Sequence, residues 1–236
     1  MQRIFRRNPA VFCGIDGCRG GWVAVFLPKS GPAGAWAEIH SGWESLQFDG
    51  LAAAAVDMPI GLPDTGLRGC DMQARELLGA ARSRVFPHLR RPLLGLVGDY
   101  RGANAWAKRD GKGISKQAFN ILPKIKQIDD RIAPDDQARI KEAHPELAFA
   151  RLNGGEPLTS KATDRGLRAR ARLLRAAGFA GVEAMWRVVK GRGVKRDDLY
   201  DACVLALTAQ RIARGKAVCL GSGKRDARGL KMEIWY

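Results

Sequence analysis

Short apolar runs, broken by glycine and proline, dominate the first sixty residues. Four of them have the length and bounding residues of β-strands, at 11–15, 22–27, 35–40 and 51–56. The glycine-rich segment 17–21 separates the first two and predicts a connection longer than a two-residue hairpin loop. Residues 42–47 fit a short helix, and Pro59 and Pro63 stop the fourth run.

Helical spacing replaces this pattern beyond residue 64. Three helices are predicted, at 70–78, 99–108 and 116–131, and we interpret 64–135 as a helical insertion over the core. An extended stretch, a basic helix, a strand, a helix and a short strand follow, at 140–152, 160–177, 182–189, 197–214 and 217–220. This order predicts one α/β domain over residues 1–236, a mixed sheet with helices on both faces.

Composition agrees with one soluble domain of 236 residues, 46% of them hydrophobic. No apolar run approaches the roughly 20 residues that span a bilayer, so no membrane partner is expected. The arginines near the N-terminus are not followed by an apolar signal-peptide segment, which favours a cytoplasmic location. Five scattered cysteines without a CxxC pair fit a reducing compartment and argue against structural zinc.

Charge narrows the class of partner. The chain has 40 Lys and Arg against 24 Asp and Glu, a net charge of +16. Such an excess favours polyanions, nucleic acid first, because neutralising phosphates releases condensed counterions. Where the less numerous Asp and Glu residues cluster, they are therefore candidates for a functional site.

Two apolar strands end in an aspartate. The string VFCGID closes on Asp16, and AAAAVD closes on Asp57. An aspartate after a strand is most often a turn or capping residue. However, ligands of sheets with parallel strands bind at the carboxyl ends of those strands, so these two carboxylates are also candidates for one site.

The string RDDLYDACVLALTA adds a third candidate. Asp197 and Asp198 fit capping positions at a helix start, where free N–H groups and the helix dipole favour carboxylates. Asp201 instead lies four residues before Leu205 on the apolar stripe, so it faces the core and needs a cation or a metal. Asp198, three residues earlier, shares its face.

In EAHPELAF, Glu142 and Glu146 flank His144 and Pro145, either as a solvated turn or as part of a site. Converging carboxylates repel one another unless a cation compensates them. Hard oxygen ligands suit Mg²⁺ or Mn²⁺. Two such ions about 4 Å apart activate a water and stabilise the leaving oxygen of a phosphodiester.

Six strings in order make a recognisable set: GIDGCRGGW, VDMPIGLP with CDMQARELLG, GISKQAFNILPKI, AHPELAFARLNGG, SKATDRGLRAR and DDLYDACVLALTA. Together, over residues 12–213, they resemble an uncharacterised family described as predicted RNase H-like nucleases, the domain-of-unknown-function family numbered 429. The resemblance implies a mixed five-stranded RNase H-like sheet and a cytoplasmic nuclease that depends on Mg²⁺ or Mn²⁺. It assigns the catalytic positions to Asp16, Asp57, Glu146, Asp198 and Asp201.

The resemblance also implies which residues bind metal, namely Asp16, Asp57, Glu146 and Asp201. The D-x-x-D spacing of Asp198 and Asp201 is similar to that of Holliday-junction resolvases. Asp57 departs from the pattern, because Met58 and Pro59 follow it and are able to turn its side chain away.

Basic and polar residues supply candidate contacts to nucleic acid. Arg165, Arg168, Arg172 and Arg175 recur at helical spacing, either as a solvated face or as a contact surface for the phosphate backbone. The predicted substrate-binding set combines the first two of these arginines with residues of the strings that resemble the family. It consists of Arg19, Ser115, Gln117, Lys161, Thr163, Arg165 and Arg168.

Two other functions compete with the nuclease. The Asp-Gly turn of IDGCRGG also fits an ATP-dependent phosphotransferase of the actin-like and sugar-kinase superfold, whose glycine turn approaches phosphate. Such kinases usually duplicate the fold, and 236 residues leave little room for two copies. The positive charge alone fits a nucleic-acid-binding protein without catalysis.

Overall fold

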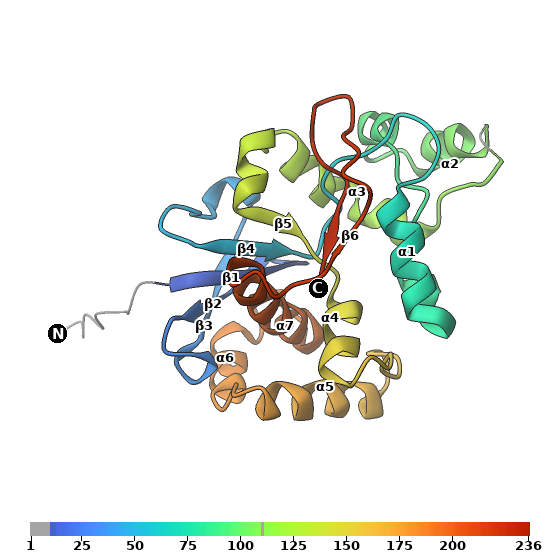
Figure 1. The fold of residues 1–236 in the computed structure, drawn as a ribbon. Coiled ribbons are helices and arrows are strands. Elements are labelled where there is room, and N and C mark those ends of the chain that lie inside the picture. The colour runs from blue at the N-terminus through green and yellow to red at the C-terminus, as the bar shows by residue number, and fades with distance from the viewer. Residues whose placement is uncertain (1–9, 110) are drawn as a thin grey trace.

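A mixed five-stranded sheet forms the centre of the protein. The computed structural model describes residues 10–109 and 111–236. The strands are β1 (Ala10–Cys18), β2 (Gly21–Pro28), β3 (Trp36–His40), β4 (Ala53–Val56) and β5 (Ile140–Glu142), in the order β3-β2-β1-β4-β5 (Figure 1). β1 and β3 pair antiparallel to β2, whereas β4 pairs parallel to β1 and β5. The predicted fold class is confirmed, and this sheet is consistent with an RNase H-like fold.

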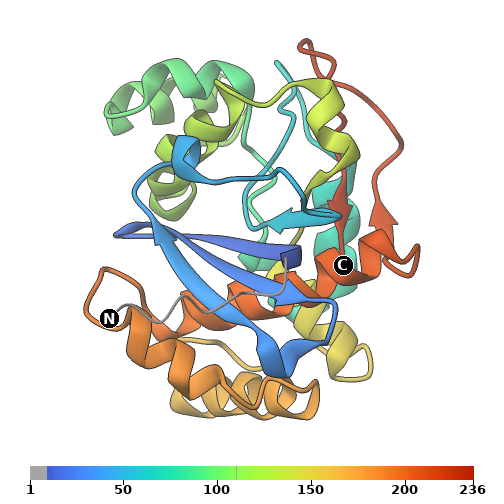
Figure 2. The same cartoon turned by 90° about the vertical axis from the view of Figure 1, so that its left-hand side faces the viewer.

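Helices lie on both faces of this sheet. They are α1 (Gly69–Leu78), α2 (Tyr100–Lys108), α3 (Lys116–Asp129), α4 (Pro145–Leu152), α5 (Asp164–Ala176), α6 (Val182–Val189) and α7 (Arg196–Ala213). Figure 2 shows α7 directly against one face with α5 and α6 outside it, and the α2–α3 region beyond the other face. A small sheet of β6 (Cys219–Leu220) and β7 (Ile234–Trp235) follows α7. Within the described residues, no helix is long and apolar enough to cross a membrane.

Side-chain alternation along the central strands creates a separate core on each face. Val23, Val25 and Leu27 of β2 pack in the core that contains α7. Trp22 and Phe26 of the same strand pack in the core that contains α2 and α3. Successive strand residues point to opposite faces, and each face of the sheet is covered by a core. Every residue of β2 is therefore buried.

Helix α7 is buried along most of its length, and every residue from Leu199 to Ala209 is buried. Its close approach to β1 depends on Gly14. A Cβ at this position would lie 2.1 Å from the carbonyl oxygen of Ala202 and 2.1 Å from the amide nitrogen of Ala206. Only a residue without a side chain therefore allows β1 and α7 to pack at this distance.

One predicted strand is wrong. Residues 182–189 form helix α6 rather than a strand. Its buried residues are Val182, Met185 and Val189, which recur at intervals of three and four and therefore mark a helix face. The β-branched composition of the segment suggested a strand, but the spacing of its buried positions decides the structure.

Two boundaries also differ from the prediction. β1 continues past Asp16 to Cys18, which pairs with Gly21, so the connection to β2 is a two-residue turn rather than a longer one. Gly21 has φ +123°, and a Cβ there would meet the carbonyl oxygen of His40 at 2.0 Å, so this tight turn requires glycine. The extended stretch predicted at 140–152 is wrong for most of its length, because only Ile140–Glu142 form a strand and Pro145–Leu152 form helix α4.

The segment between β4 and β5 contains the predicted helices as α1, α2 and α3, with 3₁₀ turns between α1 and α2 and after α3. α3 begins at Lys116 as expected and ends at Asp129, two residues before the predicted end. Residues 43–45 form a 3₁₀ turn within the predicted short helix. Residues of α1 and α3 line the cavity beside the end of β4.

Candidate metal centre

Three aspartates from three elements meet at one end of the sheet. One carboxylate oxygen each from Asp16, Asp57 and Asp201 lies within 4.8 Å of the others. Asp16 is 4% exposed and Asp201 is 1% exposed, while Asp57 is half-buried. Three acidic groups at this separation and depth repel one another strongly unless a cation lies among them. We call this group the aspartate triad.

Strand alternation places Asp16 and Asp57 on the same face. Asp16 follows Phe12 and Gly14 at intervals of two, so its side chain points toward α7. Asp57 follows Ala53 and Ala55 in the same way. The backbone N–H of Asp57 donates to the carbonyl of Ile15 (2.9 Å), which extends the parallel pairing one residue past β4. Despite Met58 and Pro59, the Asp57 side chain therefore joins the triad.

Helix α7 supplies the third carboxylate. Asp201 begins the run of buried residues that faces the sheet, as its position on the apolar stripe predicts. The next residue, Ala202, carries the carbonyl that packs against Gly14 of β1. The absence of a side chain at position 14 therefore lets α7 approach closely enough for Asp201 to reach Asp16.

Lys161 provides the local positive charge. Its ammonium lies 2.5 Å from Oδ2 of Asp201 and 3.5 Å from the carboxylate of Asp197. Burial alone would lower the pKa of Lys161, but the neighbouring Asp201, Asp16 and Asp57 carboxylates outweigh it and raise the pKa. The side chain of Lys161 is 37% exposed, so the charge lies at the solvent boundary of the site.

The pKa values of the triad show that one lysine does not balance three carboxylates. Burial, with Lys161 opposing it, raises the pKa of Asp57 to about 7 and that of Asp201 to about 7. Burial, followed by the charges of Asp57 and Asp201, raises the pKa of Asp16 well above its usual range. Near neutral pH the triad is thus only partly ionised in the absence of a further cation.

The donor set suits a hard divalent cation. All three groups are carboxylates, the ligands that Mg²⁺, Mn²⁺ and Ca²⁺ take in proteins. Oδ2 of Asp201 accepts from Lys161, but Oδ1 is buried and has no hydrogen-bond partner among the described residues. A buried acceptor without a partner is costly, and a bound cation removes that cost. The triad could therefore hold a divalent metal ion.

Comparison with known proteins places the chain in a family. A family model described as "Protein of unknown function (DUF429)" matches residues 14–225. The chain belongs to this family. The DUF429 match includes the aspartate triad and Lys161 and ends before β7. No curated protein and no solved structure matched.

The fourth predicted metal ligand, Glu146, lies in a different setting in this DUF429 protein. The guanidinium of Arg170 donates to both of its carboxylate oxygens (2.7 and 2.8 Å), and Arg84 donates to one of them (2.6 Å). Arg170 is fully buried. Glu146 and the triad residues Asp57 and Asp201 line the same cavity, but Glu146 is not within the triad's 4.8 Å group.

Asp198 begins helix α7 of the DUF429 protein. Its carboxylate accepts from the backbone N–H of Lys195 (2.8 Å), an interaction that stabilises the helix start. Burial raises the pKa of Asp198 to about 6, and its charge raises the pKa of Asp16. Asp198 thus acts electrostatically on the triad while its side chain points to the N-terminus of α7.

The predicted substrate-binding residues fall into two groups. Ser115 and Thr163 are N-caps of α3 and α5, accepting from the backbone N–H of Ala118 (3.1 Å) and Gly166 (3.1 Å). The others reach solvent or the site: Arg19 in the β1–β2 turn, Gln117 at the cavity, Lys161 beside Asp201, and Arg165 and Arg168 on the outer face of α5.

Sequence reasoning missed the buried arginines and the role of His144. Nδ1 of His144 accepts from the backbone N–H of Glu146 (3.3 Å), and Nε2 lies 3.4 Å from the carbonyl of Arg84. These contacts describe a neutral ring that caps α4, and burial lowers the pKa of His144. The His-Pro pair before a helical run was the available signal, since proline favours the first helical position.

Proposed function

We propose that this protein is a metal-dependent nuclease that hydrolyses phosphodiester bonds in DNA or RNA. The observation that carries the proposal is the convergence of the carboxylates of Asp16, Asp57 and Asp201 from β1, the end of β4 and α7, with Lys161 beside Asp201. The net charge of +16 supports a polyanionic substrate.

The triad residues would hold Mg²⁺ or Mn²⁺ through Asp16, Asp57 and Oδ1 of Asp201. When bound, two such ions activate a water and stabilise the leaving oxygen of a phosphodiester. The protein's own residues do the positioning. Lys161 fixes the Asp201 carboxylate through Oδ2, and its ammonium, at the solvent boundary, offers positive charge to an incoming phosphate.

Helix α5 extends this contact surface away from the triad. Lys161 and the cap Thr163 precede its first turn, and the helix then carries four exposed arginines: Arg165, Arg168, Arg172 and Arg175. A strand with a phosphate at Lys161 can continue along this exposed stripe.

The phosphotransferase alternative depends on free backbone amides in the first turn. The N–H of Gly20 donates to the carbonyl of Gly193 (3.2 Å), and a Cβ at Gly20 would meet the Arg192 carbonyl at 2.2 Å. The turn is thus packed against the loop before α7 and is not arranged as an open phosphate cradle. Saturable ATP binding in calorimetry would restore this alternative.

Cleavage assays with single-stranded, duplex and branched DNA and RNA test the proposal directly. With Mn²⁺ or Mg²⁺ we expect cleavage of at least one substrate, and none in EDTA. Asp16→Asn should lower the rate by at least about 100-fold, since losing a second-shell partner of a metal already costs up to about that much.

The matched control is Asp130→Asn, the same change at an exposed aspartate of the α3 terminus, which should cleave like the wild type. Circular dichroism establishes that both variants are folded. Unchanged cleavage by Asp16→Asn, or cleavage that persists in EDTA, would contradict the proposal. Salt-sensitive binding without cleavage would favour the non-catalytic alternative.

A further inference from the structure

A cavity of about 560 Å³ lies directly beside the aspartate triad. Asp57, Asp201 and Lys161 form one end of its lining. Its size falls in the range of sites that enclose small ligands rather than flat surfaces. A ligand in this cavity therefore lies next to the carboxylates that would act on a phosphodiester.

An apolar wall forms one side of the cavity. The residues are Met58, Val85, Phe86, Leu89 and Ile121. Leu89 is buried, whereas Phe86 and Ile121 are half-buried although both pack against the core of α2 and α3. An aromatic ring and aliphatic side chains of this kind offer a stacking surface for a flat, apolar ring.

The polar end of the cavity is mostly satisfied by the protein itself. Glu142 accepts from the backbone N–H of Ile60 (2.7 Å) and from Arg68. Glu146 accepts from Arg170 and Arg84, and both ring nitrogens of His144 have backbone partners. These groups have little hydrogen-bonding capacity left for a ligand.

Outside the triad, Asp71 of α1 differs from these groups. Its side chain lies 3.4 Å from Arg68 through Oδ1, and the residue is 3% exposed. Oδ2 is buried and has no hydrogen-bond partner among the described residues. A buried carboxylate oxygen without a donor is destabilising, and a ligand N–H that reached it would restore the missing hydrogen bond.

We propose that this cavity receives one nucleobase of the substrate strand, unstacked from its neighbours, with an exocyclic amino group donating to Oδ2 of Asp71. The base then lies against Phe86 and Ile121, and its sugar-phosphate is left at the triad. Unstacked bases are commonly recognised in this way, by stacking on an aromatic side chain and hydrogen bonds to a base edge. The inference rests on the proposed nuclease function and adds a preference for amino-bearing bases at the cleavage position.

Nucleosides separate the base pocket from the metal chemistry, because they carry no phosphate for the triad to repel. Adenosine and purine riboside have the same ring and sugar, but purine riboside lacks the amino group. Each nucleoside is titrated against the full chain in EDTA, and ligand-observed NMR measures its binding. Adenosine should bind about tenfold more tightly than purine riboside, because one hydrogen bond to a charged acceptor contributes about that much.

Two variants localise the binding. Ser83 is exposed and lines the cavity, so Ser83→Trp should fill it without disturbing the core and abolish the binding of both nucleosides. Ser30→Trp, at an exposed serine that does not line the cavity, is the control. Asp71→Leu should bring the two nucleosides to similar affinity, because leucine is close in size to aspartate and has no hydrogen-bond acceptor.

Binding and cleavage are scored separately. Adenosine binding that survives Ser83→Trp, or equal affinities of the two nucleosides for the wild type, would overturn the inference. So would unchanged cleavage by Ser83→Trp in a wild type that cleaves, which would leave the nuclease proposal intact. If the wild type binds adenosine in this cavity but cleaves nothing, the nuclease proposal fails and the nucleobase pocket stands.

Discussion

Two buried acidic sites line the same cavity and have opposite balances of charge. In the aspartate triad, three carboxylates lie close together, and the lysine that pairs with Asp201, Lys161, is 37% exposed. At Glu146, one carboxylate is held by two arginines, of which Arg170 is fully buried. The first site has an excess of negative charge and the second an excess of positive charge.

This difference separates a binding site from a structural ion pair. The two-oxygen contact of Arg170 with Glu146 satisfies the carboxylate in a fixed geometry, because a guanidinium presents its donors in a rigid plane. Lys161 is a single point charge, and among the described residues Oδ1 of Asp201 has no hydrogen-bond partner. We therefore expect an added cation to stabilise the triad and to have no effect at Glu146.

Removing the buried arginine of the Glu146 ion pair should have the largest effect on folding. Arg170→Met leaves the Glu146 carboxylate buried with only Arg84, and breaking a buried pair from one side costs about 3–5 kcal/mol. Equilibrium urea denaturation measures the loss. Arg165→Met, on the exposed face of the same helix, should stay within about 0.5 kcal/mol of the wild type. Equal losses in both variants would show that the Glu146 pair is not structural.

Gly14→Ala should disturb the triad without touching a carboxylate. Its Cβ meets the backbone of Ala202 and Ala206 at 2.1 Å, so β1 and α7 must separate. We expect a loss of about 3 kcal/mol, the upper range for overpacking, together with weaker Mn²⁺ binding in calorimetry. The control is Gly69→Ala at the start of α1, where the new Cβ has no neighbour within 4 Å. Wild-type Mn²⁺ affinity in Gly14→Ala would contradict the role given to this contact.

The sequence predicted the triad better than it predicted the surroundings. Asp16 and Asp57 follow from strand ends and Asp201 from an apolar stripe, because each is a local pattern of period two or 3.6. The arginine partners of Glu146 do not follow from a local pattern. Arg170 lies 24 residues away, and the packing of α4 against α5 brings it to Glu146. Helix α6 was misassigned because β-branched residues obscured its spacing.

The pH dependence of stability tests the charge imbalance of the triad. Burial raises the pKa of Asp57 to about 7, above the value of about 3.9 expected in the unfolded chain. The folded state then binds more protons between these values, so metal-free stability is full below about 4 and falls as the pH rises through about 7. We expect a lower melting temperature at pH 8 than at pH 5 in EDTA, measured by circular dichroism.

Asp57→Asn should flatten this decline, because the substituted amide does not ionise. Added Mn²⁺ should raise the melting temperature of the wild type at pH 8 and leave that of Asp57→Asn less changed, since ligands that bind the folded state stabilise it. A wild-type protein more stable at pH 8 than at pH 5 in EDTA would contradict the uncompensated state of the triad.

The exposed arginines of α5 should give the smallest effect on folding and a specific effect on binding. Arg165→Gln with Arg168→Gln removes two exposed charges near Lys161, and each lost phosphate contact lowers the slope of log affinity against log salt by about 0.9. Fluorescence anisotropy with labelled DNA or RNA at several salt concentrations measures the slope.

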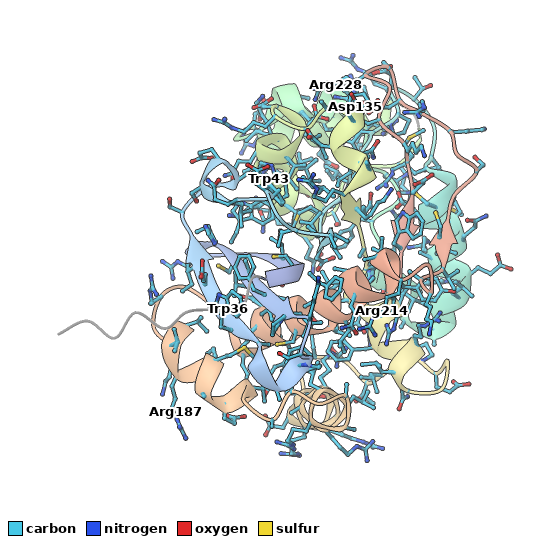
Figure 3. All side chains as sticks on the ribbon, turned by 60° about the vertical axis from the view of Figure 1, so that its left-hand side comes forward. Trp36, Trp43, Asp135, Arg187, Arg214 and Arg228 are labelled. Atoms are coloured by element: carbon cyan, nitrogen blue, oxygen red, sulfur yellow. The ribbon has the colours of Figure 1, made fainter. Side chains whose placement is uncertain are left out.

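The control removes two charges at the other end of α7, by Arg214→Gln with Lys216→Gln. Arg214 is thirteen residues from Asp201, which is about 20 Å along the helix. Figure 3 shows Arg214 near the end of α7, and Arg187 projecting from α6. Both double variants lower the net charge equally, so a general electrostatic attraction would change both slopes alike. A larger change for the α5 pair would place the nucleic acid along α5, where its backbone passes Lys161 and reaches the triad.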